Sequence, residues 1–236
     1  LKHFQALADN NNSGLQIVRL QEVFPYRVPD PWFIDKLPYY ARIPTDKLPD
    51  GFKDGMMMDV PVVESPRYLQ FLTDEFLANG GSFEVREIKS LDDLKQDHPL
   101  IVNCTGVWAK HVADDPTVYP IRGQTIVVDV PDIKQAYMDD GTFTYLFPRG
   151  DGVLIGGVAD VHNWDLEVDA TVTSDILARC SQVEPSVANA TIVNQFVGLR
   201  PGRRQVRLEA ETLSDHCTVI HNYGHAGIGY TLSWGC

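Results

Sequence analysis

The chain has 236 residues, of which 44% are hydrophobic, and its formal net charge is −12. This composition is enough for a buried core in one large domain or two smaller ones, while the acidic surface repels nucleic acid and anionic lipid. No apolar run reaches the roughly 20 residues that a membrane-spanning helix needs, and we therefore expect neither nucleic acid nor membrane as a partner.

The chain begins at Leu1 rather than at a methionine and stops at Cys236 without a polar tail, so we expect both ends to be cuts through a longer ordered protein. The four cysteines are scattered and form no close Cys-x-x-Cys pair, which argues against a structural zinc site and favours a reducing compartment. His221 and His225 are four residues apart, but glycines follow and no third ligand stands at a suitable spacing. We expect no metal.

The first quarter of the chain predicts a helix end, a strand and an irregular stretch. Residues 1–9 have helical apolar spacing and are followed by a turn cluster at 10–14. Residues 15–24 contain an alternating apolar stretch and predict a strand. Residues 25–55 are rich in proline, aspartate and aromatics, so we expect irregular surface with short strands there.

A clearer unit follows. Ser65 suits an N-cap, Pro66 suits the first helical position, and apolar residues recur with helical spacing as far as Leu77. The Asn79–Gly81 segment supplies a left-handed stop. Two strands are expected next, one from Phe83 towards Ile88 and a short buried one at residues 100–102. Helix, strand, strand at this spacing is typical of one wing of an α/β nucleotide-binding sheet.

The second half is richer in strands. Residues 125–130 predict a strand, and residues 145–148 and 153–155 predict a hairpin. A helix capped by Thr173 or Ser174 should run to about Val183. Strands at 192–199 and 219–220 follow, and the last leads into a glycine-rich turn at 224–229 with a helix start at 230–234.

Four features could carry chemistry. The glycine-rich turn can bring backbone N–H groups against a ligand, although a plain tight turn is the alternative. Arg200 ends an apolar strand just before a proline, where its guanidinium suits a carboxylate, an internal salt bridge or the surface. Tyr145 could donate to a carboxylate or be an ordinary core tyrosine. Residues 122–124 are either a bend that meets a cofactor or a simple turn.

Other arginines read as structural. Arg203, Arg204 and Arg207 stand in an acidic chain, and we expect them to pair with Glu209, Glu211 or Asp215. The usual dinucleotide signature, Gly-x-Gly-x-x-Gly after a strand, is absent.

Longer residue strings are more specific than spacing, and the resemblance they carry covers nearly the whole chain. They are Ile101–Trp108, Ile121–Thr125, Tyr145–Arg149 with Val153–Gly157 and Asn163–Trp164, Gly198–Pro201, Gln205–Glu209, and Val219–His225 through Trp234–Cys236. They resemble the D-amino-acid oxidases. The resemblance implies a mixed α/β fold, in which a Rossmann-like FAD-binding domain is interleaved with a substrate domain built on a mixed or antiparallel sheet. The implied FAD-binding segments are 1–14, 69–113 and 198–236, and the implied substrate-binding segments are 15–68 and 114–197.

The same resemblance implies the site. Arg200 would grip the substrate carboxylate, Tyr145 would assist it, and the backbone carbonyl of Gly227 would accept from the substrate amine. The implied FAD contacts are Ile88, Cys104, Thr105, Gly106, Gly198, Arg200, Ala226, Gly227, Ile228, Gly229, Tyr230 and Thr231, with Thr105 on the adenosine side and residues 226–231 facing the flavin. The family's first strand, its Gly-x-Gly-x-x-Gly turn and its C-terminal extension are missing here, so we expect this chain alone to bind FAD poorly.

The implied reaction is oxidative deamination of a D-amino acid by FAD and dioxygen, giving a 2-oxo acid, ammonia and hydrogen peroxide through hydride transfer from the α carbon. Relatives that oxidise D-aspartate carry an additional arginine where this chain has Ala159 after Val158, so we expect neutral substrates. A second tyrosine common in the family is replaced by Gly141, which opens the roof of the pocket unless Tyr137 fills it.

Three alternatives stay open: a D-aspartate oxidase, a glycine or sarcosine oxidase, and a flavin-free fragment that keeps only the fold. A homodimer is compatible with the resemblance, and a eukaryotic relative would be expected in peroxisomes, otherwise in the cytoplasm.

Overall fold

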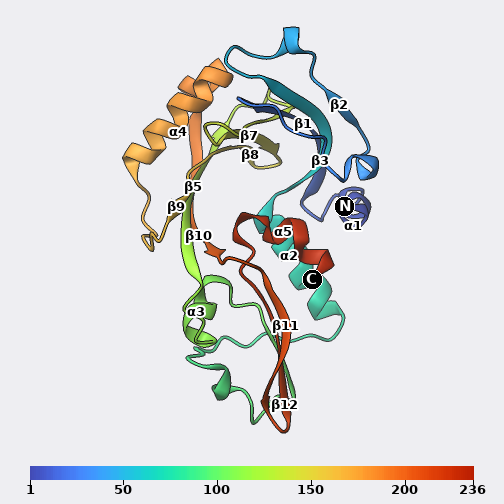
Figure 1. Cartoon of the computed structure of the whole chain (residues 1–236), viewed down its shortest axis with the longest axis vertical. Helices are drawn as coiled ribbons and strands as arrows, with labels where there is room; N and C mark the ends of the chain where they lie inside the picture. The colour runs from blue at the N-terminus through green and yellow to red at the C-terminus, as the bar shows by residue number, and fades with distance from the viewer. The chain divides into compact units, whose positions relative to one another are not determined.

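The computed structural model describes residues 1–236, which group into two compact units (Figure 1). The first unit comprises residues 1–82, 124–158 and 168–196, and the second comprises residues 83–123, 159–167 and 197–236. The chain therefore passes repeatedly from one unit to the other, and each unit is built from segments that are remote in sequence.

The helices are α1 (Lys2–Ala8), α2 (Ser65–Ala78), α3 (Ala109–Val112), α4 (Ala170–Val183) and α5 (Gly229–Leu232). The strands are β1 (Leu15–Phe24), β2 (Tyr40–Arg42), β3 (Asp54–Val63), β4 (Leu100–Asn103), β5 (Tyr119–Asp129), β6 (Ala136–Asp139), β7 (Thr144–Arg149), β8 (Gly152–Gly156), β9 (Asp160–Val161), β10 (Thr191–Gly202), β11 (Arg207–Ser214) and β12 (Cys217–Tyr223). No helix is long and apolar enough to cross a bilayer.

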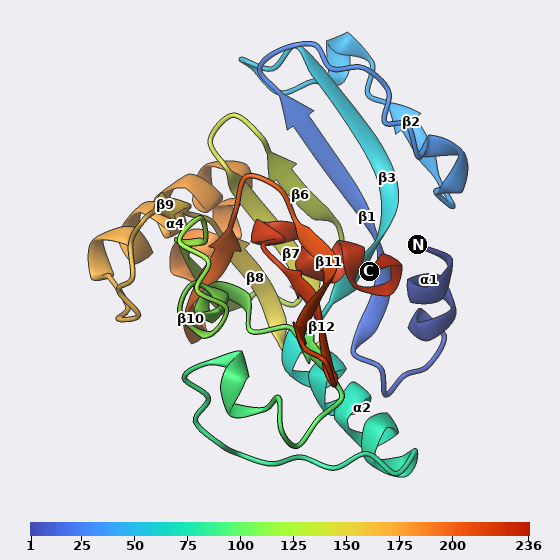
Figure 2. The same cartoon turned by 60° about the horizontal axis from the view of Figure 1, so that its bottom comes forward.

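A mixed sheet has the strand order β10-β5-β8-β7-β6-β1-β3-β2, and β9 pairs with β5. Most of this sheet belongs to the first unit, whereas residues 119–123 of β5, residues 197–202 of β10 and all of β9 belong to the second. β1 pairs with β3 antiparallel over its full length and with β6 in parallel at residues 20–23, and Figure 2 shows β1 and β3 side by side. The predicted strand at 15–24 is confirmed because its alternating apolar residues, such as Val18 and Leu20, pack against Met56 and Met58. β3 itself was not predicted.

A second core of the first unit lies between α4 and the strands β5, β7 and β8. Ile126, Ile155 and Ile176 are fully buried there, and burying each such side chain stabilises the fold by about 1.5–3 kcal/mol. The predicted hairpin is confirmed, since β7 and β8 pair antiparallel with Tyr145 opposite Gly156. Figure 1 shows α4 alongside these strands.

The two longer predicted helices form with small differences at their starts. α2 begins at Ser65 with Glu64 as the N-cap, and it ends before Gly80, whose φ of +87° provides the left-handed stop. The prediction that Thr173 or Ser174 caps the later helix is wrong. Asp169 is the cap, because its carboxylate accepts from the N–H groups of Thr171 and Val172, and α4 starts at Ala170.

The second unit contains a three-stranded sheet in the order β11-β12-β4, with β12 antiparallel to β11 and parallel to β4. Val219 and Ile101 are buried in its core. The predicted strand from Phe83 to Ile88 is wrong: this segment is irregular, Phe83 is 63% exposed, and Val85 is fully exposed. Strand propensity alone does not hold a segment extended when no neighbouring strand pairs with it.

β4 is buried on one side only. Ile101 is 7% exposed, whereas Leu100 and Val102 on its other face are each 56% exposed. The expected strand at residues 100–102 is therefore confirmed, but it is buried on the Ile101 face only.

Candidate active site

Two turns of the second unit leave the same edge of its sheet. β4 and β12 are parallel neighbours, with Asn103 opposite His221, so the segment after Asn103 and the glycine-rich turn after Tyr223 both start at the carboxyl ends of adjacent parallel strands. Ligands of α/β sheets bind at such an edge, because side-chain-free turns and backbone N–H groups collect there.

The first turn is oriented by a buried amide. Asn103 is 1% exposed, and its Oδ1 accepts from the backbone N–H and the hydroxyl of Thr105 at 3.1 and 2.7 Å. Its Nδ2 lies 3.2 Å from Nδ1 of His221, and Nε2 of that ring lies 3.0 Å from Glu211. Since an amide nitrogen can only donate, Nδ1 accepts and Nε2 carries the proton that is donated to Glu211.

The next residues of this turn leave open backbone. Nothing lies within 4 Å of the position that a Cβ would occupy at Gly106, while Cys104 is exposed and Thr105 half-buried. A planar or extended ligand can therefore approach the main chain there without meeting a side chain.

The glycine-rich turn is tightly held at its start and open further on. Gly224 has a φ of +84°, and a Cβ there would lie 2.9 Å from Cβ of Arg203, so only glycine fits. Ala226 also has a positive φ, of +47°. Gly227 and Ile228 are exposed, so the middle of the turn presents its backbone outward.

Arg200 lies beside this turn. It stands near the end of β10, and its Cδ is 3.5 Å from the Cβ position of Gly227. Its guanidinium lies over Gly123, where a Cβ would be 2.5 Å from Nη1, and Nη1 is 3.5 Å from the carbonyl oxygen of Arg122. Arg200, residues 122–123 of β5 and Gly227 are thus brought together within the second unit.

The part of β5 that lies under Arg200 is anchored by an arginine of its own. Arg122 is 2% exposed, its Nε donates to the carbonyl of Asp165 at 3.0 Å, and its Nη2 donates to the carbonyl of Glu167 at 2.5 Å. A guanidinium whose donors are taken up by backbone carbonyls fixes this strand rather than binding a ligand. The expectation of a bend or a turn at residues 122–124 is wrong, because these residues lie within β5 and Arg122 pairs with Asp160 of β9. No local signal indicated that Gly123 would lie under Arg200.

The buried carboxylate of Asp115 joins Tyr223, at the end of β12, to Arg203, just after β10. Asp115, 6% exposed, accepts from the Tyr223 hydroxyl and from Nε of Arg203, each at 2.9 Å, and from Thr117 Oγ1 at 2.5 Å. Burial alone would raise the pKa of Asp115, but these hydrogen bonds outweigh it and lower the pKa to about 2.

The predicted arginine pairs are confirmed in part. Arg207 forms ion pairs with Glu209 and Glu211, as expected. Arg203 pairs with Asp115 instead of an acidic residue close to it in sequence. Arg204 is exposed and makes none of the ion pairs in the structure.

Tyr145 belongs to the first unit and is 9% exposed. Its ring lies between Phe143 and Phe147, each with a centroid 5.7 Å away, and its hydroxyl lies where a Cβ of Gly156 or Gly157 would be. The two glycines therefore provide the room for this ring.

Tyr137 does not occupy the same face of the sheet. It pairs with Leu146 and packs against the core cluster under α4, and burial raises its pKa to about 12. Because side chains alternate along a strand, Leu146 and its partner Tyr137 lie on the face opposite Tyr145. The Tyr137 ring packs into this core, and Gly141 leaves no open space of its own, because a Cβ there would lie 2.9 Å from Cγ of Pro25.

The remaining predicted FAD residues are spread over three places. Gly198 is exposed and has nothing within 4 Å of its Cβ position, and Gly229, Tyr230 and Thr231 lie on α5 directly after the turn. Ile88 lies outside both turns, half-buried in the irregular segment between α2 and β4.

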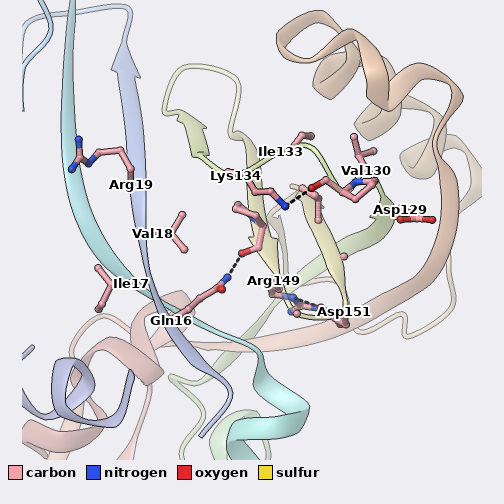
Figure 3. Close-up of a pocket in the computed structure, with 15 residues that line it drawn as sticks. Gln16, Ile17, Val18, Arg19, Asp129, Val130, Ile133, Lys134, Arg149 and Asp151 are labelled. Atoms are coloured by element: carbon pink, nitrogen blue, oxygen red, sulfur yellow. Dashed lines mark hydrogen bonds and ion pairs between the residues drawn. The ribbon is translucent and has the colours of Figure 1, made fainter. Parts of the chain in front are cut away.

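A cavity of about 540 Å³ occupies a different part of the first unit, between the start of β1 and the turn of the β7–β8 hairpin (Figure 3). Gln16 crosses it and donates to the carbonyl of Pro148 at 2.5 Å. Two of its arginines are paired, Arg19 with Asp59 and Arg149 with Asp151. None of the predicted site residues lines it.

Comparison with known proteins identifies the family. Residues 30–236 match the family model described as "FAD dependent oxidoreductase". The chain is 38% identical to a D-amino-acid oxidase of Rubrobacter xylanophilus over 99% of its own length and 73% of that protein. The chain belongs to the D-amino-acid oxidase family of FAD-dependent oxidoreductases.

The chain is also similar to a D-aspartate oxidase in sequence and to a glycine oxidase in fold. The chain is 35% identical to human D-aspartate oxidase over 73% of its length and 51% of that protein. Its fold matches the crystal structure of glycine oxidase from Geobacillus kaustophilus with a TM-score of 0.78 at 17% identity, covering 98% of this chain and 72% of that one. The mixed α/β fold is thereby confirmed, and FAD is the cofactor that family membership assigns to this oxidoreductase.

The residues present fit that cofactor. Two backbone turns with open approach meet at one carboxyl sheet edge, and Oδ1 of Asn222, one residue before the end of β12, is buried without a hydrogen-bond partner. A buried acceptor without a partner beside an open turn is a group that a bound ligand can satisfy.

Proposed function

We propose that this protein catalyses the oxidative deamination of neutral D-amino acids to 2-oxo acids, with release of ammonia and hydrogen peroxide. The observation that carries the proposal is the position of Arg200, whose guanidinium is seated on Gly123 beside the backbone of Gly227. A carboxylate-binding cation next to a bare main-chain carbonyl suits a ligand that bears both an acid group and an amine.

In this proposal Arg200 binds the substrate carboxylate through a forked pair of hydrogen bonds, and the Tyr145 hydroxyl donates to the same carboxylate. The carbonyl of Gly227 accepts from the substrate amine. These contacts hold two of the four substituents of the α carbon, the carboxylate and the amine, and so direct its hydrogen towards the cofactor. Orientation then accounts for most of the rate enhancement, and no dedicated base is required.

The FAD contacts proposed are residues 104–106, 198, 200 and 226–231 together with Ile88, in FAD-binding segments 1–14, 69–113 and 198–236. The buried Asn103 would hold Thr105 in place for the adenosine side. When bound, FAD supplies the acceptor for the hydride of the substrate α carbon and the route by which dioxygen becomes hydrogen peroxide.

Neutral substrates are favoured over acidic ones by the residues after Gly157. Val158 and Ala159 carry no charge, so this segment provides no cation for a second carboxylate. A buried side-chain carboxylate without a partner would be costly to desolvate. The alternative is a D-aspartate oxidase, and the 35% identity to human D-aspartate oxidase supports it.

Peroxide release measured with D-alanine, D-aspartate and glycine tests the proposal. We expect turnover of D-alanine to exceed that of both others, and a preference for D-aspartate or glycine would replace the proposed substrate class. Flavin absorbance of the purified full-length protein is measured alongside, because a colourless full-length protein after incubation with FAD would favour the alternative that keeps the fold without flavin.

A further inference from the structure

One arginine of α4, Arg179, forms hydrogen bonds with the segments on either side of Tyr145. Arg179 lies on the opposite face of the sheet, and its guanidinium reaches the two segments that flank Tyr145. Nη1 donates to the carbonyl of Thr142 at 3.2 Å and to the hydroxyl of Thr144 at 2.7 Å, and Nη2 donates to the carbonyl of Gly157 at 3.0 Å.

These acceptors surround Tyr145 in space. Thr144 precedes it in β7, and Gly157 is one of the two glycines against which its ring packs. The same segments are also joined by a hydrogen bond from the Gly157 N–H to the Phe143 carbonyl at 2.8 Å. One side chain therefore fixes both the strand that carries the ring and the glycine that its hydroxyl touches.

The residue after Arg179 adds a second contact with the same strand pair. Cys180 is fully buried, and its Sγ lies 3.8 Å from the carbonyl oxygens of Tyr145 and Gly156, which face each other across β7 and β8. Burial raises the pKa of this thiol to about 11, so it stays protonated and can donate.

The environment of Arg179 differs from that of a surface ion pair. Its side chain is 20% exposed, and it makes an ion pair at 2.9 Å with Asp175 one turn earlier on α4. The guanidinium of Arg179 has five N–H donors in a fixed planar fork and bonds four acceptors, counting Asp175, whereas a lysine ammonium has only three donors. The arginine is thus specific to this arrangement, whereas the ion pair alone would not require it.

We infer that Arg179 is a positioning residue for the substrate carboxylate, acting through Tyr145. It touches no substrate itself, and this inference rests on the proposed function, in which the Tyr145 hydroxyl binds that carboxylate. Without Arg179, the 142–144 segment and Gly157 are joined directly only by the bond from the Gly157 N–H to the Phe143 carbonyl, so they can shift more freely and the hydroxyl loses its fixed place. Carboxylate binding should weaken, while the chemical step on the molecules that do bind changes little.

The test is a double-mutant cycle on the FAD-loaded protein, with Arg179→Met, Tyr145→Phe and the combined variant. With D-alanine, Arg179→Met should raise KM about fivefold with kcat changed less than about twofold, and it should add no further rise in the Tyr145→Phe background. The same pattern should appear in the dissociation constant of pyruvate, a 2-oxo acid, measured from the flavin difference spectrum.

A control and a milder variant separate positioning from folding. Arg19→Gln removes a partly exposed arginine that pairs with Asp59 in the same unit, and it should lower the melting temperature without changing KM. Arg179→Lys keeps the charge and is used if Arg179→Met does not fold. It should raise KM by a smaller factor in the parent protein and leave KM unchanged in the Tyr145→Phe background.

Each outcome has a meaning. An equal rise of KM in both backgrounds would show that Arg179 acts on the fold and not through Tyr145, and it would overturn the inference while leaving the proposed function intact. If Tyr145→Phe alone leaves both KM and pyruvate binding unchanged, the proposed role of Tyr145 fails and the inference fails with it.

Discussion

The guanidinium of Arg200 lies directly on the main chain of Gly123, so closely that a Cβ at position 123 would be 2.5 Å from both of its terminal nitrogens. A Cβ does not approach non-bonded atoms that closely, so the absence of a side chain at 123 is a condition for the observed position of Arg200. The direction of this guanidinium is therefore set by a residue with no side-chain chemistry of its own.

Gly123→Ala should displace that guanidinium and weaken carboxylate binding. We expect KM for D-alanine to rise about tenfold, because a misplacement of about 1 Å costs much of the benefit of alignment. Gly235→Ala is the matched control, since nothing lies within 4 Å of its Cβ position. Steady-state kinetics of both variants check the prediction, and equal KM values would show that Arg200 accommodates the methyl group.

Replacing Arg200 separates charge from geometry. Arg200→Gln should lower kcat/KM for D-alanine by about 100-fold or more, as expected for loss of a charge-assisted fork worth about 3 kcal/mol. Arg200→Lys should recover only a small part of that loss. With D-alaninamide, which lacks the carboxylate, the parent and the variants should differ far less, and a uniform loss on both substrates would argue against carboxylate binding by Arg200.

Asp115 should make stability depend on pH under acidic conditions. Its pKa is lowered to about 2, whereas the pKa of an unfolded aspartate is about 4. The stabilisation that Asp115 gives the folded state is therefore complete above the unfolded pKa and is lost as the pH falls from about 5 to 2. The contribution is about 2 kcal/mol. Urea unfolding at several pH values should show a shallower acid-side loss in Asp115→Asn, and parallel profiles would contradict the assignment.

The core beneath α4 should be sensitive to volume. Ile155 is fully buried between β5, β7 and α4, and Ile155→Ala should lower the unfolding free energy by about 3–4 kcal/mol. Ile17→Ala, at a residue 38% exposed on β1, should cost less than about 1 kcal/mol. Denaturant melts of the two variants give the comparison, and similar midpoints would place Ile155 outside the stabilising core.

Local patterns predicted the elements whose own residues specify them. β1 alternates, the β7–β8 hairpin has a glycine turn between apolar runs, and α2 carries both a start and a stop signal. β3 escaped prediction because its three consecutive methionines and Pro61 do not alternate, and the strand is specified by its pairing with β1. The segment from Phe83 to Ile88 shows the reverse case, in which suitable residues have no partner strand.

The residues of the candidate site also divide into those that a local sequence pattern indicates and those that it does not. Arg200 and the glycine-rich turn were indicated by composition and position, because a charge at the end of an apolar strand and clustered glycines are visible in one segment. The pairing of Arg203 with Asp115 joins residues 88 positions apart, and no local signal announces it. Two of the four acceptors of Arg179 are the backbone carbonyls of Thr142 and Gly157, and because every residue has such a carbonyl, these two contacts leave no mark in the sequence.

The half-covered strand β4 has a consequence for how molecules of this protein meet one another. An edge strand with Leu100 and Val102 turned to solvent is a template on which another chain can pair, and such edges promote aggregation. The net charge of −12 opposes that encounter by repulsion between molecules, and dissolved salt weakens the repulsion over a distance of about 10 Å at 0.1 M. Colloidal stability of the protein should therefore fall as ionic strength rises.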